Sequence, residues 1–169
     1  KKPGKVHNHP EYAAMVANMD ENVGRVLRRL DEPKLSDNTV VILTSDNGCV
    51  DFKSSKSGNI APTQNAPLRS VKGTLYQGRI RVPLMIRWPG LTKPGTECGA
   101  MVTSQDFFPT LAEGFGHKLG DLPKHDGVSL LPQLRNPKTR LTRKTLYWHY
   151  PHYYSRMTPG SAVRDGNWK

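Results

Sequence analysis

Three polar residues in the middle of the chain have side chains that suit the binding of a cation and an anion. Asp46 and Asn47 follow a short apolar run at residues 39–44. Their carboxylate and amide oxygens are hard ligands of the kind that calcium and magnesium prefer. Gly48 allows the backbone to turn so that both side chains can face one site. Lys72, in a later glycine-containing loop, can place a compact positive charge on an anionic oxygen.

Each of these patterns also has a plain structural interpretation. The sequence Ser-Asp-Asn-Gly at residues 45–48 is typical of an ordinary turn. A lysine taken alone is more often a solvated surface residue. The combination is what favours chemistry: an acid and an amide after a strand, then a polar loop that presents a lysine, then a second apolar run. We interpret this order as half of a site for an anionic ester.

The segments before this site predict an α/β arrangement. Pro10 suits the first turn of a helix, and apolar residues spaced by three and four between residues 12 and 30 form one stripe, which we expect to face the core. Residues 39–44 predict a strand covered on both faces, and residues 82–88 predict a second strand. A helix followed by a buried strand favours an α/β sheet, whose ligands gather beyond the carboxyl ends of strands.

The second half of the chain predicts shorter elements. Asp106 suits the N-cap of a helix that contains Phe107, Phe108, Leu111 and Ala112. Other expected elements are a short strand at residues 102–104, a short helix at 128–134, a strand at 145–150 and the opening of a strand at 161–168. His149 and His152 could line the rim of a pocket, but packing and surface roles are the simpler interpretation.

Composition limits the classes of partner. The chain has 169 residues with 25 basic and 14 acidic side chains, a formal net charge of +11, which favours anionic partners. The basic residues are scattered and no nucleic-acid motif accompanies them, so we expect no nucleic acid. No apolar run approaches the roughly 20 residues that span a bilayer, so we expect no membrane association. Cys49 and Cys98 form no C-x-x-C motif, and whether they pair stays open.

The order of motifs resembles the sulfatase family, the formylglycine-dependent sulfuric ester hydrolases of the alkaline phosphatase superfamily. The resemblance covers essentially the whole chain. Its central motifs are Ser45-Asp46-Asn47-Gly48, Pro67-Leu68-Arg69, Lys72-Gly73-Thr74-Leu75-Tyr76, Ile80-Arg81-Val82-Pro83-Leu84 and Trp88-Pro89-Gly90, with further similarity at residues 12–24, 106–111, 126–130 and 162–169.

The resemblance implies a fold, a location and roles for individual residues. Asp46 and Asn47 would bind a divalent cation, usually Ca2+ with Mg2+ as the alternative, and Lys72 would contact the sulfate group. Residues 1–140 would be the C-terminal part of an alkaline-phosphatase-like mixed sheet with flanking helices. Residues 141–169 would begin a small antiparallel C-terminal subdomain. A periplasmic or secreted location follows from the same resemblance.

The sequence departs from the family at the nucleophile. The family's formylglycine is made from the Cys or Ser of a C/S-x-P-x-R motif, and the sequence contains no such motif. Residues 65–69 have the Pro and the Arg at the right spacing but begin with Asn65. We therefore assign no catalytic residue, expect the formylglycine and two further aspartates in a missing N-terminal part, and predict that this chain alone is inactive.

A second departure is Gln77-Gly78-Arg79, where the family often has Glu followed by two glycines. Arg79 could contact a carboxylate or a second sulfate of the substrate, although an outward-facing arginine is the simpler interpretation. Two other functions stay open: a phosphoesterase or phosphonate hydrolase of the same superfamily, and a non-catalytic module that binds a sulfated polymer. Expected partners are a sulfate ester or a sulfated polysaccharide, together with self-association through exposed sheet edges and apolar surface.

Overall fold

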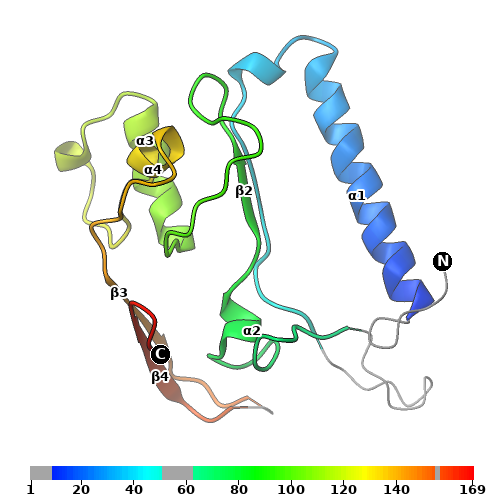
Figure 1. Ribbon diagram of the computed structural model, residues 1–169, viewed down its shortest axis with the longest axis vertical. Helices are drawn as coiled ribbons and strands as arrows, with labels where there is room; N and C mark the ends of the chain where they lie inside the picture. The colour runs from blue at the N-terminus through cyan, green and yellow to red at the C-terminus, as the bar shows by residue number, and fades with distance from the viewer. Residues whose placement is uncertain (1–8, 51–62, 155–156) are drawn as a thin grey trace. The chain divides into compact units, whose positions relative to one another are not determined.

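The computed structural model describes residues 9–50, 63–154 and 157–169 (Figure 1). Two compact units divide the chain: unit 1 comprises Lys1–Ile86 and Trp148–Ala162, and unit 2 comprises Arg87–Tyr147 and Val163–Lys169. The expected division at residue 140 concerns the parts of a larger enzyme and stays a prediction. The elements are α1 Pro10–Asp31, η1 Ser36–Asn38, β1 Val41–Thr44, α2 Gln77–Ile80, β2 Leu84–Arg87, η2 Ser104–Asp106, α3 Phe107–Gly114, η3 Leu119–Asp121, α4 Leu131–Arg135, β3 Thr145–Tyr150 and β4 Gly160–Asp165.

Helix α1 begins at Pro10 as the sequence predicts, and the ring nitrogen Nδ1 of His9 accepts a hydrogen bond from the Tyr12 amide (3.3 Å) at its start. The expectation that its apolar stripe faces a core is wrong, because no residue of α1 is buried. Met15 and Met19 are 69% and 62% exposed. The periodicity predicted the helix correctly, but in the part of the chain that the structure describes its apolar stripe is largely exposed.

The first sheet consists of β1 and β2. Its strands run antiparallel: the Thr44 hydroxyl donates to the Pro83 carbonyl (3.0 Å), and beyond the strand ends the Gly48 amide donates to the Arg79 carbonyl (2.7 Å). Both strands lie inside their predicted ranges. The expected cover on both faces of β1 is wrong, since Leu43 is 41% exposed. In the described sheet, β1 has one neighbouring strand and only partial cover.

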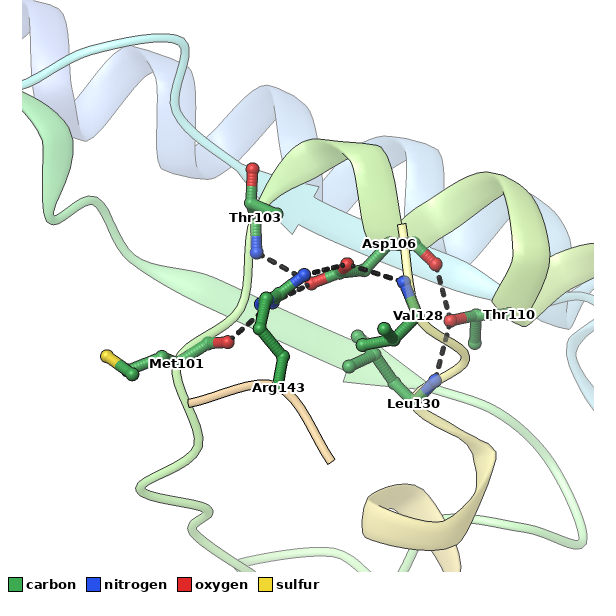
Figure 2. Close-up of polar contacts among 7 residues, drawn as sticks. All are labelled: Met101, Thr103, Asp106, Thr110, Val128, Leu130 and Arg143. Atoms are coloured by element: carbon green, nitrogen blue, oxygen red, sulfur yellow. Dashed lines mark hydrogen bonds and ion pairs between the residues drawn. The ribbon is translucent and has the colours of Figure 1, made fainter. Parts of the chain in front are cut away.

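Unit 2 is organised around Asp106, which is fully buried (Figure 2). Its carboxylate accepts hydrogen bonds from the amides of Thr103 (2.8 Å) and Val128 (2.9 Å) and two from the guanidinium of Arg143 (both 2.7 Å). Arg143 also donates to the Met101 carbonyl (2.7 Å). One ion pair thus joins three segments that are distant in sequence.

This network corrects two expectations. Asp106 stands at the N-cap position of α3, but its carboxylate makes no capping bond to that helix. Instead it forms a capping box with Thr103 around η2, and the strand expected at residues 102–104 does not form. A carboxylate with partners from distant segments gains more hydrogen bonds than a local cap offers.

The remaining predicted elements form, with shifts at some ends. The helix expected at residues 128–134 is α4, Leu131–Arg135, which begins three residues later than predicted, and β3 has its predicted bounds. The strand expected at residues 161–168 is β4, Gly160–Asp165, which ends three residues earlier than predicted. Strand β4 runs antiparallel to β3, because Thr145 pairs with Asp165 (3.1 Å) and His149 pairs with Ser161 (2.9 Å) through their side chains. Within the described ranges, none of the helices combines the length and apolar character needed to cross a bilayer. The chain is therefore a mixed α/β structure with small antiparallel sheets.

Candidate active site

The turn that follows β1 presents Asp46 and Asn47. The Ser45 hydroxyl donates to the Asn47 carbonyl (2.8 Å), and the Asn47 side-chain amide nitrogen donates to the Gly48 carbonyl (3.0 Å). A carboxamide is planar, so this bond directs the amide oxygen away from that carbonyl. Asp46 is exposed and Asn47 is half-buried. Neither of these two hydrogen bonds uses the side-chain oxygen atoms of Asp46 or Asn47.

Gly48 brings this turn against the start of α2. Its amide donates to the Arg79 carbonyl (2.7 Å), and a Cβ atom added at Gly48 would overlap the carbonyl oxygen of Gly78. Any other residue would force the two backbones apart. The glycine of the Ser-Asp-Asn-Gly turn is therefore required by close approach to a neighbouring segment.

Lys72 is attached to the same turn through its backbone. Its amide donates to the Cys49 carbonyl (2.9 Å), three residues after Asp46. Lys72 is exposed, whereas Val71 and Gly73 on either side of it are buried. This alternation anchors the loop and leaves the ammonium group at the surface. The structure thus places the backbones of the predicted site residues side by side, while convergence of their side chains on one ligand stays a prediction.

Asn65 holds this arrangement together, and the sequence did not identify it. Its side-chain oxygen accepts a hydrogen bond from the Cys49 amide (3.4 Å), and its nitrogen donates to the carbonyls of Ser70 (3.2 Å) and Gly78. One side chain therefore joins the strand-end turn to both sides of the loop that carries Lys72. In the sequence, Asn65 stands where a nucleophile motif would begin with Cys or Ser, and this local pattern does not predict its three partners.

The loop that carries Lys72, residues 65–79, packs around a small apolar centre. Val71 and Leu75 are 8% and 7% exposed. The Arg69 guanidinium lies 4.0 Å from the centroid of the Tyr76 ring, and such cation–π contacts stabilise loops by roughly 0.5–1 kcal/mol at exposed sites. The lysine is thus presented by an ordered loop.

Asp46 and Asn47 fit part of a calcium site. They supply two hard oxygen ligands, whereas calcium takes about six to eight. Within the described residues, no group of three or more His, Cys, Asp or Glu side chains lies close enough to hold a metal ion. The donor type therefore suits the cation, and the described residues supply only a fraction of its ligands.

Comparisons with known proteins identify the family. The Sulfatase family model matches residues 2–117, and the model for N-sulphoglucosamine sulphohydrolase, C-terminal, matches residues 71–169. A protein named Sulfatase from Formosa agariphila is 38% identical over 93% of this chain and 29% of its own length. The steryl-sulfatase of Mus musculus is 36% identical over 92% of this chain and 25% of its own length.

A solved structure shows the same fold over this part. The structure of BT4656 in complex with its substrate D-glucosamine-2-N,6-O-disulfate matches with a TM-score of 0.65 and 28% identity, over 89% of this chain and 28% of that one. This chain therefore spans less than a third of the length of the relatives it matches. The resemblance inferred from the motifs is confirmed: the chain belongs to the sulfatase family.

Proposed function

We propose that this chain supplies part of a sulfatase active site, in which Asp46 and Asn47 bind a divalent cation and Lys72 contacts the sulfate group. The whole enzyme would hydrolyse a sulfate ester to an alcohol or phenol and inorganic sulfate. The observation that carries the proposal is the hydrogen bond between the Lys72 amide and the Cys49 carbonyl (2.9 Å). It ties the only lysine of residues 63–79 to the turn that bears both oxygen ligands.

Lys72 would bind the negatively charged oxygens of the sulfate ester. Its ammonium group carries three donors and a full positive charge, so it can hold the sulfuryl oxygens and offset charge that develops as the ester bond breaks. A bound divalent cation would supply further charge stabilisation at the same oxygens. Asp46 contributes one negative charge toward such a cation, and Asn47 contributes a neutral oxygen.

We assign the nucleophile to no residue of this sequence. The family forms its formylglycine within a C/S-x-P-x-R motif, and residues 65–69, the nearest match, begin with Asn65. The structure gives the Asn65 side chain three hydrogen-bond partners in the surrounding backbone. Asn65 therefore supports the loop, and we expect this chain alone to bind sulfate without hydrolysing an ester.

A sulfated sugar is the substrate class that we propose. The structure of BT4656 holds a disulfated glucosamine as its substrate. The formal net charge of +11 in this chain would attract such polyanions and raise their rate of encounter. A sulfated-polymer-binding module remains a second candidate, because the same charge and the absence of the nucleophile motif suit binding without turnover.

A chemical-shift titration tests the proposal. The chain is titrated with sodium sulfate, in calcium chloride and separately without it, while the amide signals are followed. We expect saturable shifts at Asn47, Gly48 and Lys72, strengthened by calcium and abolished by Lys72→Ala. The matched control is Lys118→Ala, an exposed lysine of unit 2, which should leave the titration unchanged. If Lys72→Ala leaves these chemical-shift changes unaltered, the proposed role of Lys72 is refuted.

A second titration, with a sulfated glycan at several salt concentrations, separates the two candidates. A polymer-binding module would hold a sulfated glycan through many scattered charges, so its affinity should fall steeply with salt and respond little to any single lysine. A sulfatase site should depend on Lys72 and on calcium. Binding that depends on neither would favour the module.

A further inference from the structure

Aromatic side chains gather in residues 150–154, which begin with the last residue of β3 and belong to unit 1. Tyr150 and His152 meet edge to face, with ring centroids 5.4 Å apart. Tyr153 and Tyr154 are 84% and 41% exposed. We call residues 150–154 the aromatic segment. Large rings left at a surface mark sites where a partner with apolar and polar groups can pack.

The aromatic segment touches the loop that carries Lys72. A Cβ atom added at Gly73 would overlap the ring of Tyr154, so the glycine backbone lies directly against that ring. Gly73 also has a φ of 98°, a conformation that favours glycine. Gly73 directly follows Lys72 in the sequence. The Tyr154 ring therefore contacts the residue next to the proposed sulfate-contacting lysine.

Arg79 makes a second contact between the same segments. Its guanidinium lies 5.2 Å from the centroid of the Tyr150 ring and donates to the Thr74 carbonyl (3.3 Å). Its backbone carbonyl accepts the Gly48 amide (2.7 Å), which places Arg79 beside the Asp46–Asn47 turn. Arg79 is half-buried and stacked, so the expectation of a simple outward-facing arginine is wrong.

We propose that Arg79 and the aromatic segment form a saccharide subsite next to Lys72, which takes a sulfated sugar that carries a second anionic group. Tyrosine offers an apolar ring face and a polar hydroxyl, which suit the C–H faces and hydroxyl groups of a sugar. Arginine has five donors in a planar fork, so after its bond to Thr74 it can still bind a sulfate or carboxylate through two of them. This inference rests on the proposed function, because it places the first sulfate at Lys72.

Three ligands of increasing complexity test the subsite by chemical-shift titration in calcium chloride: inorganic sulfate, D-glucosamine-6-sulfate and D-glucosamine-2-N,6-O-disulfate. We expect the disulfated sugar to bind more tightly than either other ligand and to shift signals near Arg79 and Tyr154. Arg79→Met, which keeps an unbranched stem, should weaken the disulfated sugar about fivefold to tenfold and leave inorganic sulfate unchanged. The matched control is Arg81→Met, at an exposed arginine two residues away.

A second variant tests the aromatic contribution. Tyr154→Ala should weaken both sugars and spare inorganic sulfate, whereas Tyr147→Ala, at a tyrosine that is 78% exposed in β3, should weaken neither. Circular dichroism shows whether Tyr154→Ala stays folded, and Arg79→Met gives an independent result if it does not.

The outcomes of these titrations distinguish a failure of the saccharide subsite from a failure of the proposed function. Equal affinities for inorganic sulfate and the disulfated sugar would overturn the subsite and leave the role of Lys72 standing. Sugar binding that Arg79→Met does not change would also overturn it. If inorganic sulfate fails to shift Lys72 while the disulfated sugar still depends on Arg79, the subsite is supported and the proposed sulfatase site is refuted.

Discussion

Replacing Asp106 with asparagine should destabilise unit 2 severely. Asp106 is 0% exposed and Arg143 has only 13% of its side chain exposed, so Asp106→Asn leaves a buried guanidinium without its counter-charge. The Nε atom of Arg143 already has no hydrogen-bond partner among the described residues. Breaking a buried ion pair by removing one partner costs about 3–5 kcal/mol. Since domains of this size are stable by about 5–15 kcal/mol, the loss is a large share of the total.

Urea denaturation followed by circular dichroism measures this loss. With a slope of about 2 kcal/mol per molar urea, the transition midpoint should fall by roughly 2 M. The matched control is Asp121→Asn, at an exposed aspartate in η3, which should change the free energy of unfolding by less than about 0.5 kcal/mol. A loss below about 1 kcal/mol for Asp106→Asn would refute the reasoning, because it would mean that the pair is not buried.

The same pair makes a prediction about acid. Burial alone would raise the pKa of Asp106, but the hydrogen bonds from Arg143 and from the Thr103 and Val128 amides outweigh it and hold the pKa below its ordinary value. A carboxyl with a lowered pKa stabilises the fold above its unfolded pKa of about 3.9, and that contribution is lost as pH falls through the folded value. The difference between wild type and Asp106→Asn should therefore be constant above about pH 5 and shrink below about pH 4.

Three further predictions concern the site and the surface. Gly48→Ala should destabilise unit 1 by about 1–3 kcal/mol in urea, because its Cβ atom would overlap the Gly78 carbonyl; an unchanged midpoint would contradict that close approach. The purified chain with calcium should give no turnover of an aryl sulfate above background, and measurable turnover would show that it contains a nucleophile. The exposed stripe of α1 should cause self-association in light scattering that Met15→Glu with Met19→Glu abolishes; a monodisperse wild-type monomer would contradict this.

Local sequence patterns predicted where the helices and strands lie better than they predicted how deeply those elements are buried. Pro10 and the spacing of apolar residues gave α1, and the β-branched run before Asp46 gave β1, because both depend on contacts within a few residues. Burial depends on what packs from outside the segment, which periodicity does not contain. For this reason the apolar stripe of α1 and the last two residues of β1, Leu43 and Thr44, are exposed, although the sequence predicts that they are covered.

The candidate site shows the same limit, because local sequence patterns do not predict contacts between distant segments. Residue type and motif order were enough to select Asp46, Asn47 and Lys72. They could not reveal the supporting role of Asn65, whose partners lie 5, 13 and 16 residues away. They singled out Arg79 as a departure from the family pattern, but not its contact with Tyr150, which lies far along the chain. Side chains that join distant segments carry no local signature, and the contacts of these two residues are therefore the main additions that the structure makes.

Backbone hydrogen bonds and the Asn65 side chain, and not the side chains of Asp46, Asn47 and Lys72, bring the site residues together, and this separates chemistry from positioning. The Lys72 amide and the Gly48 amide both bond across segments, to Cys49 and Arg79. Lys72→Ala keeps its amide, so the loop should stay in place while sulfate binding is lost. Gly48→Ala keeps the ammonium group but pushes the turn away from α2, so stability and binding should fall together. A Lys72→Ala variant that unfolded as readily as Gly48→Ala would show that the lysine is part of the scaffold and not of the sulfate site.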